Sequence, residues 1–427
     1  MKRKMRRLVG LVALATLALA TPGVEAQLLS DLAEAAENLL VRPLEAAWDA
    51  TFGKAPDAAG TVYLELLPNA TETGALCLDG SPAGYWFRKG WGDGKDKWLV
   101  FLEGGGWCFN EQDCYERSKT ILGSSKQWAQ TRSDRSSQIF SADPKENPDF
   151  YNWNLVDVAY CDGASFSGNV AEPITVNGEE IYFRGKNILE ATVWHLKYGK
   201  GMTFATDVVL AGCSAGGLAT LLHADWFETR LGPSVKNYKA ISFSGFFPDT
   251  PNFQGEPWYP SVMKYVYEMQ QVDIHSPGCL ADNMNEQYKC FFAQNQYRHI
   301  KTPVFLANSV YDMYTISVIY NVSQQTIPEN ENNLVVPYLN DKSRSLWDLI
   351  SWTGTWWAGK NGGFLHTCFT HCAGCLTDSG WSGVKVDGMS LRDYLGLWLR
   401  NQVARTREPC VYTLGEPFQC NPTCPPL

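Results

Sequence analysis

The segment at residues 207–231 constrains the fold of this chain more than any other. It begins with the apolar run DVVLA, which has the character of a buried strand, and ends with a stretch of helical spacing. The two are joined at residues 212–216 by Gly-Cys-Ser-Ala-Gly. A serine between small residues on a tight strand-to-helix turn exposes its hydroxyl above a sheet, so we expect Ser214 to be a nucleophile. An ordinary glycine-rich turn is the alternative.

Further apolar runs alternate with helical patterns along the chain. The expected strands lie at residues 98–102, 155–160, 207–211, 240–244 and 303–307, and helical patterns cover residues 187–198 and 215–231. Strands separated by helices favour an α/β fold with a mostly parallel central sheet and helices on both faces. Residues 315–360 are rich in tryptophan and predict a loop-rich insertion or lid.

The beginning of the chain has the features of a secretory signal. Seven residues, MKRKMRR, precede an apolar stretch of about 13 residues, which is shorter than the ~20 that span a bilayer. Small residues then predict cleavage after Ala26 or after Ala20; a membrane anchor is the alternative. We divide the chain into a signal peptide (1–26), a helical or pro-like segment (27–59), the main domain (60–407) and a tail rich in cysteine and proline (408–427).

Thirteen cysteines behind such a signal indicate an oxidising compartment and a set of disulfides. Our pairing hypotheses are Cys77 with Cys161, Cys108 with Cys114, and Cys279 with Cys290. The cysteine count is odd, and we expect Cys213, beside Ser214, to be the free buried thiol.

The remaining composition narrows the class of protein. Asn69 and Asn321 begin glycosylation sequons, which supports a secreted, extracellular or cell-wall location without a stable membrane anchor. The formal net charge is -9, so nucleic acid is not an expected partner. We expect a monomer.

An acyl-transfer serine needs hydrogen-bond donors for the oxyanion that forms when it attacks. The N–H of Ala215 follows the nucleophile directly, and the glycine-rich turn in LEGGGWC, after the strand at 98–102, supplies the others. We select the N–H groups of Gly105 and Gly106, because glycine lets the turn adopt the required backbone angles. A phosphate-binding loop is excluded, since no Lys-Ser/Thr pair follows these glycines.

In an α/β fold with such a serine, the acid follows the serine along the chain and the base follows the acid, each on a loop after a late strand. Asp312 lies just after the strand at 303–307, at the expected carboxyl end of the sheet, where we expect the acid. Asp249 and Asp273 are less well placed for this role. Only His366 and His371 come later than Asp312. Chain order leaves both histidines open as the base.

Several motifs together resemble one family. LEGGGWC, GCSAGG, NSVYD and CFTHC occur in the order found in pectin acetylesterases and the related Notum-type carboxylesterases. The resemblance implies an α/β-hydrolase fold and a catalytic triad of Ser214, Asp312 and His371, and it is the resemblance that selects His371 over His366. It also implies hydrolysis of O-acetyl esters on pectin or another cell-wall polysaccharide, without a cofactor.

Two alternatives to this function remain open at the level of sequence. The first is the same chemistry on another acyl ester, such as a lipid-modified protein. The second is a non-catalytic secreted protein that binds sugar or is stabilised by zinc, because Cys368, His371, Cys372 and Cys375 have the spacing of zinc ligands. In an oxidising compartment these cysteines form disulfides more readily than they bind zinc, so we expect no metal.

Overall fold

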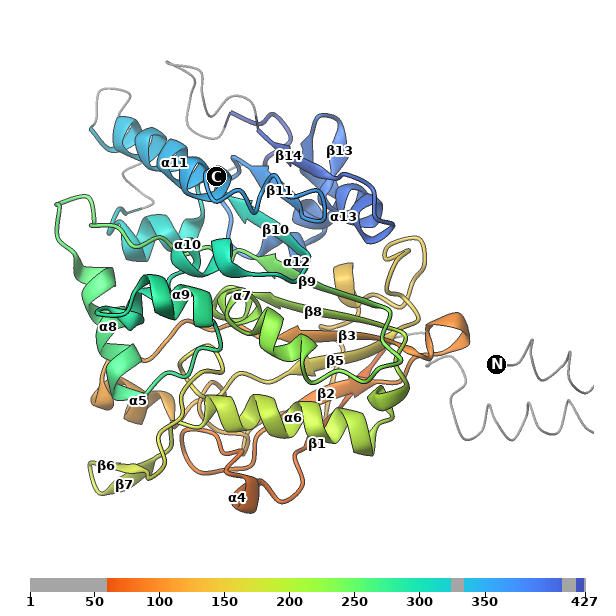
Figure 1. Ribbon diagram of the computed structural model, residues 1–427, viewed down its shortest axis with the longest axis vertical. Helices are drawn as coiled ribbons and strands as arrows, with labels where there is room; N and C mark the ends of the chain where they lie inside the picture. The colour runs from red at the N-terminus through yellow and green to blue at the C-terminus, as the bar shows by residue number, and fades with distance from the viewer. Residues whose placement is uncertain (1–59, 324–333, 409–419, 426–427) are drawn as a thin grey trace, which may run out of the picture. The chain divides into compact units, whose positions relative to one another are not determined.

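The computed structural model describes residues 60–323, 334–408 and 420–425. Within them the chain forms a ten-stranded sheet in the order β14-β11-β10-β9-β8-β3-β5-β2-β1-β4 (Figure 1). The strands from β14 to β5 pair in parallel, and β2, β1 and β4 add an antiparallel edge. Their bounds are β1 Val62–Leu66, β2 Gly84–Arg88, β3 Lys97–Leu102, β4 Thr131–Arg132, β5 Asn154–Val158, β8 Asp207–Cys213, β9 Asn237–Phe243, β10 Val304–Ser309, β11 Gly362–His366 and β14 Arg405–Arg407.

All five predicted strands are present, as β3, β5, β8, β9 and β10, and the two predicted helices are α6 (Gly185–Gly199) and α7 (Ala215–Glu228). The other main helices are α5 Glu111–Arg117, α8 Trp258–Met269, α9 Pro277–Asp282, α11 Val335–Ser351 and α13 Leu391–Leu399, with shorter turns at α4 Ala70–Thr73, α10 Ala293–Gln296 and α12 Ala373–Leu376. Two-stranded ribbons are formed by β6 (Ile174–Val176) with β7 (Glu179–Ile181), and by β12 (Lys385–Val386) with β13 (Met389–Ser390).

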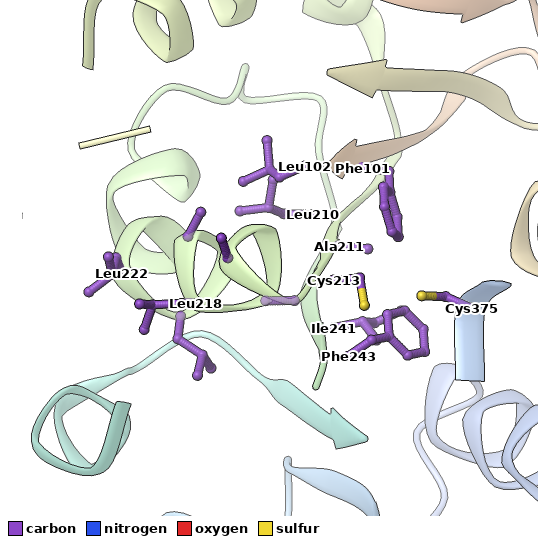
Figure 2. Packing of buried hydrophobic residues seen from close by; sticks show 14 of the residues in the cluster. Phe101, Leu102, Leu210, Ala211, Cys213, Leu218, Leu222, Ile241, Phe243 and Cys375 are labelled. Carbon is purple, nitrogen blue, oxygen red and sulfur yellow. The ribbon is translucent and has the colours of Figure 1, made fainter. Parts of the chain in front are cut away.

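Helices cover both faces of the sheet, as the alternation of apolar runs predicted. Gly212 and Ser242 are register partners and therefore share one face, where the Ser242 hydroxyl donates to the Gly217 carbonyl of α7. On the opposite face, the Phe305 ring packs against Trp398 of α13 at 5.4 Å between centroids. Figure 2 shows the same division around the end of β8, with Leu218 and Leu222 of α7 on one side and Phe243 and Cys375 on another.

The region between β10 and β11 differs from the predicted loop-rich insertion. It contains the 17-residue helix α11, whose buried residues include Leu339, Leu346 and Ile350. These recur at helical spacing, so one apolar stripe of α11 packs against the protein core. We gave weight to the many tryptophans of this region and did not detect the helical spacing of its apolar residues in the sequence. Residues 324–333 of the predicted insertion lie outside the described residues, as do the signal peptide and the predicted N-terminal helix.

The three predicted disulfides, Cys77–Cys161, Cys108–Cys114 and Cys279–Cys290, are present. The prediction for Cys213 was wrong, because Cys213 is bonded to Cys372. Cys375 is the free cysteine among the described residues, and it is buried. In that part of the chain we find no helix with the length and apolar character needed to cross a membrane.

Candidate active site

Ser214 occupies a strained turn at the end of β8. Its φ of 59° and ψ of -126° lie outside the regions that ordinary residues prefer, and α7 begins at the next residue. Such a turn requires small neighbours. A Cβ on Gly212 would lie 2.2 Å from the Gly216 carbonyl oxygen, and one on Gly216 would lie 2.0 Å from the Leu102 oxygen. The local sequence therefore dictates that the Ser214 hydroxyl projects from the carboxyl end of the sheet.

Asp312 and His371 come from loops that follow β10 and β11. These strands run parallel to β8, so their carboxyl ends lie at the same edge of the sheet. His371 Nδ1 lies 2.8 Å from Asp312 Oδ2, and His371 Nε2 lies 2.8 Å from Ser214 Oγ. The structure thus brings together the three side chains that the sequence singled out, although they are widely separated along the chain.

The environment holds this arrangement in one orientation. Asp312 is 2 % exposed, and its Oδ1 accepts a hydrogen bond from the Thr315 N–H at 3.0 Å. With its second oxygen on His371 Nδ1, the carboxylate favours the tautomer that carries the proton on Nδ1 and leaves Nε2 to accept from Ser214. The Tyr314 ring stacks on the His371 imidazole at 5.5 Å between centroids, so rotation of the imidazole is restricted.

His366, the other candidate base, is placed differently. It ends β11, and its Nδ1 accepts a hydrogen bond from the Cys368 N–H at 3.2 Å. Burial lowers the pKa of His366 to about 4, which holds it neutral. His366 is thus a largely buried residue that shapes the backbone before His371.

The glycine turn predicted for the oxyanion lies beside Ser214. A Cβ on Gly104 would be 2.8 Å from the Ser214 Cβ, so only glycine permits this approach. Gly105 and Gly106 have φ values of 152° and 67°. In the described part of the chain, the N–H groups of Gly105 and Gly106 have no hydrogen-bond acceptor, and Ala215 is the first residue of α7 and so lacks an intrahelical acceptor. All three predicted donors are available to a ligand.

Two of the three cysteines in the stretch LHTCFTHCAGC form disulfides, and the third, Cys375, is free. Cys368 is bonded to Cys424 and Cys372 to Cys213. Neither thiol is therefore available to a zinc ion, and the stretch serves to place His371. The Cys213–Cys372 pairing has a signal that we did not use: these residues directly precede Ser214 and directly follow His371, so contact between serine and histidine brings the two cysteines within bonding distance.

Ser214 and His371 open into a cleft of about 760 Å³. Its walls combine apolar and charged side chains, namely Trp86, Ile121, Leu122, Trp128 and Met313 with Glu103, Arg132, Asp134 and Arg135. From the sequence we assigned none of these side chains to the site, because their approach to Ser214 depends on how distant strands and loops meet in the folded chain.

The charged residues of the cleft form one network with Asp157 of β5. Arg135 Nη2 lies 2.7 Å from Glu103 Oε1, and Arg135 Nε lies 2.7 Å from Asp157 Oδ2. Arg132 bonds to the same two carboxylates, and its guanidinium lies 4.5 Å from the centroid of the Trp86 ring. Two arginines and two carboxylates with little access to water thus make one side of the cleft polar and rigid.

Comparison with known proteins agrees with this geometry. The pectinacetylesterase family model matches residues 56–425. This chain belongs to the pectinacetylesterase family. It is 36% identical to pectin acetylesterase 5 of Arabidopsis thaliana over 380 residues, which cover 85% of this chain and 84% of that protein. It is also 30% identical to the mouse palmitoleoyl-protein carboxylesterase NOTUM over 386 residues, which cover 85% and 72% of the two chains.

A solved structure of the Wnt deacylase Notum from Drosophila shares the fold. Its TM-score is 0.72 at 26% sequence identity, and the match covers 86% of this chain and all of that one. Membership of this family of ester hydrolases makes the protein a carboxylesterase with an α/β-hydrolase-like fold. A non-catalytic sugar-binding or zinc-stabilised protein is no longer a competing description.

Proposed function

We propose that this protein is a secreted serine esterase that removes O-acetyl groups from pectin or another cell-wall polysaccharide. The observation that carries the chemistry is the unbroken hydrogen-bonded series from Asp312 through His371 to Ser214, with both links at 2.8 Å. Secretion is supported by the basic and apolar start of the sequence and by the disulfides.

The proposed reaction begins when Ser214 Oγ attacks the ester carbonyl carbon and His371 Nε2 takes the hydroxyl proton. Asp312 stabilises the imidazolium that results. The N–H groups of Gly105, Gly106 and Ala215 hold the negative oxygen of the tetrahedral intermediate. The bond to the sugar oxygen then breaks, and that oxygen leaves with the proton from His371. Water, activated by His371, attacks the acyl-enzyme in the same way and releases acetate.

The cleft favours a short acyl group over a long one. A long alkyl chain entering it would lie against Asp134, the exposed charged group of the lining, and would remove water from this carboxylate without replacing its hydrogen bonds. An acetyl group needs little of this volume, and the hydroxyl groups of a sugar can bond to the charged wall. The lipid-modified protein of the Notum-type alternative is less compatible with such a wall.

A hydrolysis assay on esters of graded acyl length tests this proposal. We expect the highest kcat/KM on acetyl esters, a steep fall by eight carbons, and release of acetate from acetylated pectin. Ser214→Ala and His371→Ala should be inactive, whereas His366→Ala should retain hydrolysis. Preference for long acyl chains would replace the proposed substrate with the lipid alternative, and an inactive His366→Ala beside an active His371→Ala would overturn the assignment of the base.

A further inference from the structure

The arginine that ends α5 contacts the glycine turn at the candidate oxyanion site. Arg117 Nη1 donates to the Gly105 carbonyl at 2.9 Å, and Arg117 Nε donates to the Leu122 carbonyl at 3.1 Å. The second bond anchors the guanidinium, so its contact with Gly105 has one orientation. Arg117 therefore lies directly behind the oxyanion turn, which we define as Gly104–Gly106.

Because the peptide bond is planar, the contact between Arg117 and the Gly105 carbonyl also determines the direction of the Gly106 N–H. In a trans peptide, the carbonyl of one residue and the N–H of the next point in opposite directions. When Arg117 holds the Gly105 carbonyl, it directs the Gly106 N–H away from the guanidinium. Gly105 and Gly106 have φ values of 152° and 67°, and glycine peptides rotate easily, so the turn needs an external contact to hold this plane.

The next peptide plane is held in the same way. The Tyr160 hydroxyl donates to the Gly106 carbonyl at 2.8 Å and accepts from the Ser165 N–H at 2.9 Å. The Arg117 guanidinium lies 5.3 Å from the centroid of the Tyr160 ring, which ties the two contacts together. Arg117 and Tyr160 thus fix two successive planes of the oxyanion turn.

Arg117 also brings a positive charge to the back of the turn. Among the described residues it forms no ion pair within 4.0 Å, and its Nη2 atom is buried without a hydrogen-bond partner. Burial raises the pKa of Asp162 to about 6, and the charge of Arg117 acts on it in the opposite direction from a greater distance. A cation behind the turn favours negative charge on the oxygen that the turn binds.

We propose that Arg117 is a positioning residue for ester hydrolysis, which acts through the Gly105–Gly106 peptide to orient the oxyanion donor, with Tyr160 as its partner. This inference rests on the proposed function of Ser214 as the nucleophile. It predicts an effect on the transition state, where the oxyanion exists, and little effect on the ground state.

The test compares Arg117→Gln, Arg117→Lys and Tyr160→Phe with wild type, and uses Arg230→Gln as a control that removes an arginine from a surface ion pair with Glu190. The readouts are kcat and KM on a phenyl acetate, the inhibition constant of a boronic acid and the Tm. Removing an oxyanion donor costs 100-fold or more in kcat, so we expect a loss of about 100-fold for Arg117→Gln and about 10-fold for Tyr160→Phe. KM should change less than threefold.

Boronic acid binding should weaken in proportion to kcat/KM, because the boronate imitates the tetrahedral intermediate. Arg117→Lys retains the charge and cannot make both carbonyl bonds, so an intermediate loss at unchanged Tm separates position from folding. A kcat within threefold of wild type in Arg117→Gln, or a loss confined to KM, would overturn the inference and leave the function of Ser214 standing. Failure of the wild-type protein to hydrolyse any ester would instead contradict the proposed function.

Discussion

Breaking the Cys213–Cys372 disulfide should damage both stability and catalysis. This bond joins the residue before Ser214 to the residue after His371, with 6.0 Å between their Cα atoms. It therefore connects the nucleophile turn on β8 to the loop that follows β11. Figure 2 shows the Cys375 side chain directed toward the end of β8, where Cys213 lies, so replacing Cys372 alone would release a cysteine that could pair with Cys375. The experiment therefore replaces both cysteines of the bond.

The size of the stability effect follows from the length of chain that the bond closes. A separation of 159 residues corresponds to about 5 kcal/mol of lost loop entropy in the unfolded chain. Cys279–Cys290, with a separation of 11 residues, corresponds to about 3 kcal/mol and is the matched control. The double variant Cys213→Ala/Cys372→Ala should therefore lose about 2 kcal/mol more free energy of unfolding than Cys279→Ala/Cys290→Ala.

Urea unfolding measures this difference, and kcat on an acetyl ester measures the consequence for the site. Because a displacement of about 1 Å can cost 100-fold in rate, we expect kcat to fall at least ~10-fold in the first variant. The control should keep kcat within about twofold, since its bond lies elsewhere in the fold. Equal losses of stability in the two double variants, with kcat unchanged in both, would refute the view that this bond aligns Ser214 with His371.

Three further predictions concern single positions. Gly104→Ala should abolish hydrolysis because its Cβ would lie 2.3 Å from the Cys213 carbonyl oxygen, whereas Gly359→Ala, with open space around it, should be active; an active Gly104→Ala would contradict the predicted close approach. Burial lowers the folded-state pKa of His223 to about 3, so the unfolded state binds this proton first and stability falls as the pH drops below about 6.5. Urea unfolding at pH 7 and pH 4.5 should therefore show a smaller acid loss for His223→Gln, and an identical loss would exclude His223 as a source. Cys375 should resist alkylation until the protein unfolds, as mass mapping can establish; rapid labelling of the native protein would show that it is not buried.

Much of the fold was predictable because it depends on local pattern. Apolar runs separated by helical periods are enough to indicate a parallel sheet, and the packing of α7 and α13 on opposite faces agrees with them. The prediction failed where composition obscured the period. α11 has a clear apolar stripe, yet the tryptophans at its end suggested an irregular insertion.

The choice of the catalytic histidine could not be made from the sequence pattern alone. His366 and His371 are five residues apart, and neither spacing nor chain order separates them. The path of the chain after β11 determines which histidine reaches the serine. His366 ends the strand and accepts a hydrogen bond from the Cys368 N–H, whereas His371 lies within hydrogen-bonding distance of Ser214. Family resemblance selected the same residue without giving this reason.

By itself, the sequence determined the nucleophile turn, the glycine turn and the strands that carry them. These are local features, in which steric limits on a few adjacent residues dictate the backbone. Only the tertiary structure decided which cysteine is free, how Arg117 contacts the oxyanion turn, and that Arg132 and Arg135 form one wall of the cleft. These depend on proximity between distant segments, and no local pattern encodes the distance between two loops that meet only when the sheet is complete.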